Sequence, residues 1–70
     1  MIYRVKYLSE GKTVFLGRGK LSQQGTVYYH PSAVRVAVKG FERRFPIHAG
    51  KGVIIKIEQG RVVGEENAIF

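Results

Sequence analysis

The chain has 70 residues, of which 12 are Lys or Arg and 5 are acidic, and it contains no Cys. At this length we expect one small domain, residues 1–70, that buries about 60% of its unfolded surface. The absence of Cys excludes disulfides, a thiolate nucleophile and a Cys-based zinc site. A hydrophobic content of 44% is typical of a folded protein, whereas a net charge of +7 points to an anionic partner.

The uninterrupted apolar runs are short and reach three residues at most, as in residues 14–16 and 53–55. A membrane-spanning helix needs about 20 apolar residues. Arg4 and Lys6 place charges where a signal peptide has its apolar stretch. We therefore expect a cytoplasmic location and no integral membrane association. The many Lys, Arg and Glu residues resemble the composition of thermophile proteins.

The first predicted element is a β-hairpin of residues 2–8 and 12–21. Apolar and basic residues alternate in its first strand, which indicates one buried face and one solvated face. A three-residue loop would place Gly11 in the left-handed third position. In that register Val5 lies opposite Phe15, and both would face the core.

The middle of the chain predicts three further short strands, residues 26–30, 33–39 and 41–47. Three Val residues alternate in the second of these, and β-branched residues favour strands. A helix over the same residues is the alternative, because Ser32 would serve as its N-cap and Gly40 as its C-terminal stop.

The last predicted hairpin joins residues 53–57 to residues 61–63, with Gly60 in the third loop position. The apolar tail, residues 68–70, would pack onto the body or pair as a short strand. Six or seven short strands with little or no helix predict an all-β fold. A small antiparallel barrel, or a two-sheet sandwich, would hide the strand edges, and a homo-oligomer is the other way to hide them.

The positive charge is concentrated in residues 1–44, which carry nine basic side chains and two Glu. The predicted pairing of the first hairpin gathers four cations on one face: Arg4, Lys6, Arg18 and Lys20. A turn at Lys39 and Gly40 would set Arg35 opposite Arg44, and Arg suits bidentate phosphate contacts. The alternative is that these cations only solubilise the surface and protect the strand edges.

Tyr28 and Tyr29 are the aromatic residues that we single out for binding. Adjacent strand residues point to opposite faces, so one of the two rings is expected to be exposed. Proteins that bind single strands stack bases on aromatic rings beside a basic groove. Tyr3, Tyr7 and Phe15 fall on the predicted core face and are expected to pack there.

Catalysis and metal binding have little support in the sequence. His30 and His48 are the only histidines, Asp is absent, and no acidic residues stand at ligand spacing from either His. The Ser residues lie in predicted turns without a neighbouring acid–base pair. We therefore expect no enzymatic activity, no metal site and no cofactor.

The predicted function is a non-enzymatic basic β module that binds nucleic acid through phosphate contacts, with little sequence specificity. Its size, basicity and first hairpin are loosely similar to those of small archaeal chromatin barrels. The alternative is a protein-interaction or self-assembly module that meets an acidic protein surface or another copy. The succession of short strands and turns along the chain loosely resembles that of a pleckstrin-homology-like barrel. An anionic lipid surface is a third candidate partner.

Overall fold

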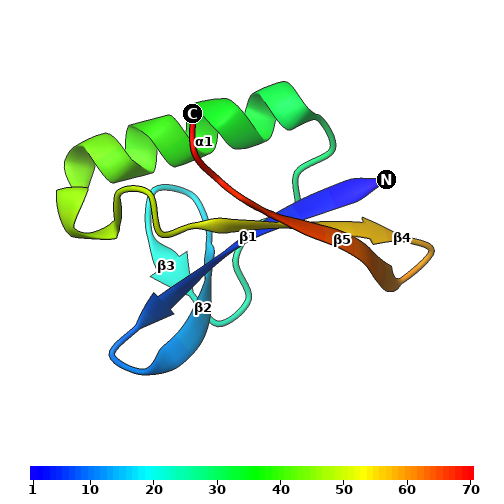
Figure 1. Ribbon diagram of the computed structural model, residues 1–70, viewed down its shortest axis with the longest axis horizontal. Coiled ribbons are helices and arrows are strands. Elements are labelled where there is room, and N and C mark those ends of the chain that lie inside the picture. Colours follow the sequence, from blue (N-terminus) through cyan, green and yellow to red (C-terminus); the bar gives the residue numbers. More distant parts are fainter.

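The computed structural model describes all 70 residues and shows a five-stranded antiparallel sheet with one helix across it (Figure 1). The elements in chain order are β1 (Ile2–Ser9), β2 (Lys12–Leu16), β3 (Leu21–Ser22), α1 (Pro31–Arg44), the short 3-10 helix η1 (Pro46–His48), β4 (Val53–Glu58) and β5 (Arg61–Asn67). The strand order is β3-β2-β1-β4-β5. The mostly β character is confirmed, but the predicted barrel or sandwich is wrong, because the sheet stays open.

Both predicted hairpins are present, but their loops have two residues instead of three. Glu10 and Gly11 have φ angles of 52° and 77°, and Gln59 and Gly60 have 53° and 75°. Positive φ at both central positions defines a type I′ turn, whose twist matches that of the flanking strands.

The shorter first loop moves the register of β1 and β2 by one residue. Phe15 lies opposite Lys6, whereas the predicted partner was Val5. A shift of one residue exchanges the two faces of a strand. Phe15 therefore lies on the face of the sheet away from α1, and Val14 and Leu16 take the core positions.

Residues 33–39 form the middle of α1, so the predicted strand is wrong here and a helix is right. Its predicted ends are wrong, because His30 is the N-cap instead of Ser32 and the helix continues through Gly40. Val34, Val38 and Phe41 are buried and follow helical spacing, whereas Val36 is 73% exposed. Burial of this stripe overrides the weak β propensity of Val. Pro31 begins the helix, since its fixed φ suits the first position and its missing N–H costs nothing there.

Two other predicted strands are also absent. Residues 41–47 form the last turn of α1 and the start of η1, because Phe41 belongs to the buried helical stripe. Residues 26–30 make only one antiparallel bridge, in which Tyr28 and Tyr3 exchange backbone hydrogen bonds of 2.7 and 2.8 Å. Tyr28 fills the position beside β1 where β2 has already diverged.

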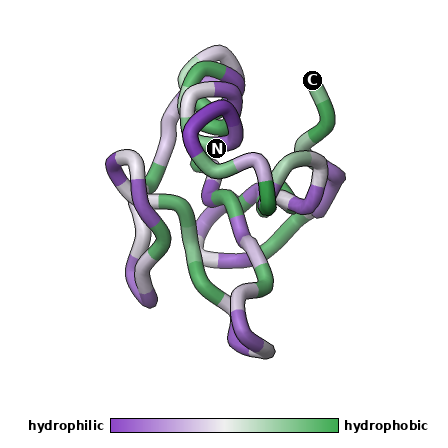
Figure 2. Tube along the Cα trace, turned by 90° about the vertical axis from the view of Figure 1, so that its left-hand side faces the viewer, coloured by the Kyte–Doolittle hydropathy of each residue, from purple (hydrophilic) through white to green (hydrophobic).

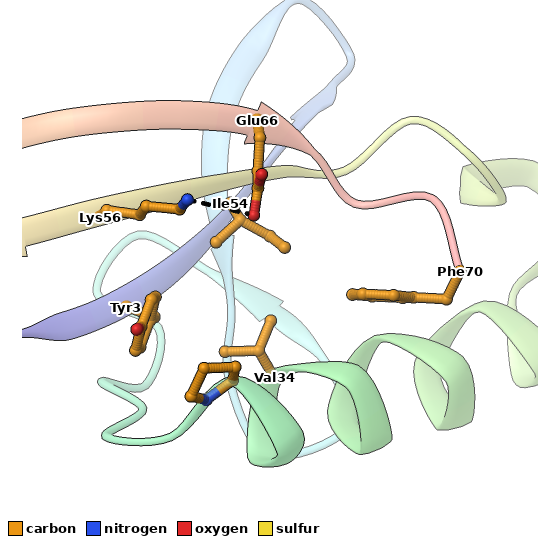
Figure 3. Close-up of a pocket in the computed structure, with 7 residues that line it drawn as sticks. Tyr3, Val34, Ile54, Lys56, Glu66 and Phe70 are labelled. Atoms are coloured by element: carbon orange, nitrogen blue, oxygen red, sulfur yellow. Dashed lines mark ion pairs between the residues drawn. The ribbon is translucent and has the colours of Figure 1, made fainter.

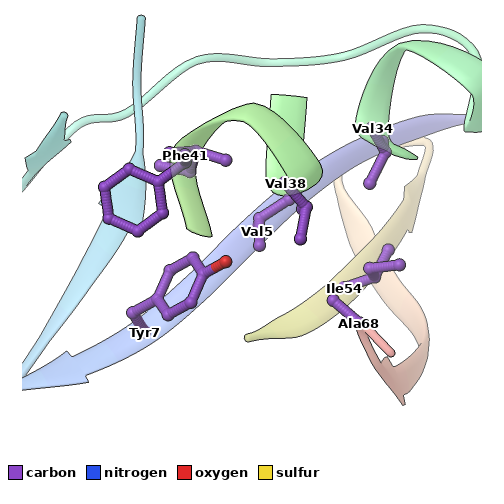
Figure 4. Close-up of a cluster of buried hydrophobic side chains, with 8 residues drawn as sticks. Val5, Tyr7, Val34, Val38, Phe41, Ile54 and Ala68 are labelled. Atoms are coloured by element: carbon purple, nitrogen blue, oxygen red, sulfur yellow. The ribbon is translucent and has the colours of Figure 1, made fainter. Parts of the chain in front are cut away.

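The core lies between α1 and the sheet, and Figure 4 shows the side chains that meet there. Its buried members are Val5, Tyr7, Leu16, Val34, Val38, Phe41, Ile54 and Ala68. The chain end joins this core through Ala68, which is 1% exposed and donates its N–H to the carbonyl oxygen of Gly52. The expectation that the tail packs onto the body is thus confirmed for Ala68.

Polar and apolar residues alternate along much of the trace, as Figure 2 shows. The hairpin turns are hydrophilic, and the chain end beyond β5 is hydrophobic. The helices fall short of the length and apolarity that a membrane crossing demands.

Candidate basic and aromatic surface

Arg4 and Lys6 lie on the face of the sheet away from α1, and both have partners within the protein. The Arg4 guanidinium carbon is 3.7 Å from the centroid of the Phe15 ring, and Arg4 donates a hydrogen bond to the carbonyl of Gln24. Lys6 forms an ion pair of 3.5 Å with Glu65. These contacts partly satisfy both cations before any ligand arrives.

Arg18 and Lys20 do not join Arg4 and Lys6, so the predicted face of four cations is wrong. The reason is that β2 ends at Leu16, and both residues are exposed in the turn that leads to β3. Gly17 donates a backbone hydrogen bond of 2.7 Å to the carbonyl of Lys20, which closes this tight turn.

Arg35 and Arg44 are not cross-strand neighbours, because both lie on α1. Nine positions at about 100° per residue place them on opposite flanks of the helix. The Arg35 guanidinium carbon is 5.9 Å from the ring centroid of Phe70, and that of Arg44 is 5.6 Å from the ring centroid of Phe45.

The structure does bring the end of α1 beside the turn between β2 and β3. The Nη1 atom of Arg44 is 3.2 Å from the position that a Cβ on Gly19 would occupy. Lys39 and Arg43 follow Arg35 at intervals of four on α1 and are exposed. These cations extend around the exposed side of α1, from the flank of Arg35 to the flank of Arg44, and onto the turn between β2 and β3. We call the combined set the basic surface, and it consists of Arg18, Lys20, Arg35, Lys39, Arg43 and Arg44.

Glu42 is the one acidic residue of α1, and its carboxylate is turned toward the protein. It accepts hydrogen bonds from the Tyr7 hydroxyl at 2.7 Å and from the Gly50 N–H at 3.1 Å. The outer surface of α1 is therefore basic without an interspersed acid.

Tyr28 and Tyr29 differ in exposure, as expected for the pair. Tyr29 is 68% exposed, whereas Tyr28 is half-buried and donates its hydroxyl to the carbonyl of Gly17 at 3.3 Å. Burial raises the pKa of Tyr28. Tyr28 thus has a structural role beside β1, and Tyr29 is the ring available to a ligand.

The structure shows a hollow next to the basic surface that the sequence did not predict. It has a volume of about 240 Å³. We call it the aromatic hollow, and it is lined by Lys20, Leu21, Phe41, Phe45 and His48. The signal that would have revealed it is the spacing of Phe41 and Phe45, which places two rings on one side of a helix. In the predicted strand the two rings would also share a face, but they would lie about 13 Å apart and could not line one hollow.

A second cavity, of about 130 Å³, lies between the start of α1 and the β4–β5 hairpin (Figure 3). Its lining residues are Tyr3, Pro31, Val34, Ile54, Lys56, Glu66 and Phe70. Its two charges form an ion pair of 3.4 Å, from Lys56 to Glu66. Each charge already has its partner, so this cavity offers a ligand mainly apolar contacts.

Comparison with protein-family models, with curated proteins and with solved structures found no match for this chain. The arrangement of side chains is therefore the basis for the function proposed below.

Proposed function

We propose that the protein is a non-enzymatic nucleic-acid-binding module that holds phosphates on the basic surface. The observation that carries this proposal is that no carboxylate pairs with any of its six cations. The two ion pairs of the protein, Lys6–Glu65 and Lys56–Glu66, both lie on the sheet. Six exposed cations without acidic partners repel one another, and a polyanion relieves that repulsion.

The spacing of the cations suits a phosphate backbone. Arg35 and Arg43 are eight residues apart on α1, which is about 12 Å along the helix axis. Phosphates recur about every 3.4 Å along each strand of a duplex, so the helix would span several of them. Phosphate contacts fix the position of the protein on the nucleic acid but do not read the base sequence. They therefore support binding of low sequence specificity. Arg4 and Lys6 are secondary in this proposal because they already have internal partners.

The test is a titration of a fluorescently labelled oligonucleotide, followed by anisotropy at several salt concentrations. If the six cations each release a counterion, log K falls against log salt with a slope of about −4 to −5. Absent binding, or binding that does not respond to salt, would overturn the proposal.

Two double variants, each lacking two positive charges, distinguish binding by the basic surface from binding by net charge alone. Lys39→Gln with Arg43→Gln removes two charges from α1, and Lys12→Gln with Arg61→Gln removes two exposed charges from the first residues of β2 and β5. The first pair should weaken binding and reduce the salt slope by about 2, since each phosphate contact contributes about 1. Equal losses from both pairs would contradict a localised surface.

The alternative proposal is a protein-interaction or self-assembly module, and the side of the sheet away from α1 favours it. On that side Leu8 is 68% exposed and Val62 is 58% exposed. Sedimentation velocity tests self-assembly, because Leu8→Lys with Val62→Lys should dissociate an oligomer formed there. A wild-type protein that stays monomeric at all concentrations would exclude self-assembly.

A further inference from the structure

We propose that the aromatic hollow receives one unpaired nucleobase, so that the protein prefers single-stranded nucleic acid to duplex. This inference rests on the proposed function and specifies its substrate class. It is carried by the rings of Phe45 and His48 together with the cations that flank them.

The rings form a layered cluster with a buried floor. Phe41 is 4% exposed, and its ring centroid is 5.1 Å from that of Phe45 and 5.6 Å from that of His48. The planes of Phe41 and His48 are inclined by only 25°, so these two rings are stacked. Tyr7 closes the cluster from the sheet side, with ring centroids 5.2 Å from Phe41 and 5.7 Å from His48.

Phe45 is the ring on which a base would lie. It is 40% exposed. The exposed part of the ring does not gain the free energy that burial of apolar surface would give. It directly follows α1, and Pro46 then begins η1, so the backbone on both sides holds the ring in place. Every base has a π face, so stacking on Phe45 needs no particular sequence.

The charges around the hollow match a nucleotide and not a neutral apolar ligand. Lys20 lines the hollow, and the Arg44 guanidinium carbon lies 5.6 Å from the centroid of the Phe45 ring. Arg44 also reaches Gly19, in the turn that carries Arg18. A base on Phe45 would therefore have its flanking phosphates beside three cations.

His48 adds polar atoms to the hollow. The side-chain hydrogen bonds of the protein involve neither of its ring nitrogens. They remain available for the edge of a bound base, which offers donors and acceptors once it is unpaired. In a duplex stacking covers the faces of the bases and pairing covers their Watson–Crick edges, so only a single strand can fill the hollow.

The test compares three probes of equal length: an oligothymidylate, the same backbone with abasic sites, and a duplex. The single strand should bind about 5- to 150-fold more tightly than the abasic strand, which is the range that the loss of one stacked base costs in comparable sites. Equal affinity for the single strand and the abasic strand would overturn the inference while leaving phosphate binding intact. No salt-dependent affinity for any of the three probes would overturn the proposed function itself.

Two matched variants report on the hollow directly, because the chain has no Trp of its own. Phe45→Trp should keep binding and lose fluorescence when oligothymidylate stacks on the new ring. Ile47→Trp, at a site 73% exposed and outside the hollow, should show little quenching. Phe45→Ala should reduce the preference for the single strand over the abasic strand, and circular dichroism checks that this variant is folded. Equal quenching at both Trp positions would place the base elsewhere and overturn the inference.

Discussion

The hydroxyl of Tyr7 donates a 2.7 Å hydrogen bond to the carboxylate of Glu42, joining the middle of β1 to the last turn of α1. The same carboxylate accepts the N–H of Gly50, so three separate segments meet at one side chain. Glu42 is thereby withdrawn from the outer surface of α1. One hydrogen bond thus contributes both to the packing of the helix and to its basic exterior.

Tyr7→Phe should destabilise the protein by about 2 kcal/mol, the usual range for a hydrogen bond to a charged group being about 1.5–3 kcal/mol. The ring contacts are preserved and only the hydroxyl is lost. The midpoint of urea unfolding measures the change. Tyr28→Phe is the matched control, because its hydrogen bond to Gly17 is longer, at 3.3 Å, and goes to an uncharged carbonyl. Equal losses in the two variants would contradict a special role for Glu42.

Stability should fall above about pH 10, the ordinary pKa of tyrosine. Burial, and then the hydrogen bond and charge of Glu42, raise the pKa of Tyr7 well above that value. A raised folded-state pKa means that the stabilisation is complete below the unfolded-state pKa and is lost as pH rises past it.

The pH effect is measured by urea unfolding between pH 8 and pH 11. Wild type should lose up to about 1.4 kcal/mol per pH unit more than Tyr7→Phe in the alkaline part of this range. Lysine titration affects both proteins alike, so the difference isolates Tyr7. If the stability of the two proteins falls equally with pH, the raised pKa of Tyr7 is contradicted.

The valines of α1 distinguish the helix from a strand. Val38→Ala should cost about 2 kcal/mol, because Val38 is 1% exposed and its removal leaves a cavity. Val36→Ala should change stability by less than about 0.5 kcal/mol, because Val36 is 73% exposed. In a strand the two side chains would share one face. Similar losses from both substitutions in thermal unfolding would therefore contradict the helix.

Gly52→Ala should destabilise the fold by about 1–3 kcal/mol through overpacking. A Cβ at this position would lie 2.9 Å from the Cζ and hydroxyl oxygen of Tyr7, whose ring is held by Phe41 and His48. Gly40→Ala is the contrasting substitution, since an added Cβ meets nothing within 4 Å. It should raise stability by about 0.5–1 kcal/mol, as Ala is the better helix former. Differential scanning calorimetry compares the two, and a Gly52→Ala protein as stable as wild type would refute the close contact.

The sequence located both hairpins and the inward face of β1, because glycine positions and alternation are local signals. It missed the register by one residue, since a two-residue and a three-residue loop both place Gly11 at positive φ. It missed α1 because Val34, Val36 and Val38 satisfy a period of two, whereas Val34, Val38 and Phe41 satisfy helical spacing. Only the burial of Phe41 in three dimensions decides between these periods.

The basic surface could be predicted in composition but not in position. The excess of cations before residue 45 is visible in the sequence, yet its grouping depends on the secondary structure of residues 31–44. On a helix, Arg35, Lys39 and Arg43 form one stripe, whereas on the predicted strands Arg43 would face away from the other two. The proximity of Arg44 to Gly19 is a tertiary contact between distant segments and leaves no local signal.

The pairing of β1 with β4 places Val5 opposite Ile54 and thereby joins the beginning of the chain to its last hairpin. Each hairpin alone is a two-stranded ribbon, which is marginally stable in water. Joining them requires closure of a long loop, and α1 lies within that loop. Neither half of the chain is therefore a folding unit by itself. We therefore expect the sheet, the helix and the surfaces they carry to form together in one cooperative step, and this distant pairing to slow it.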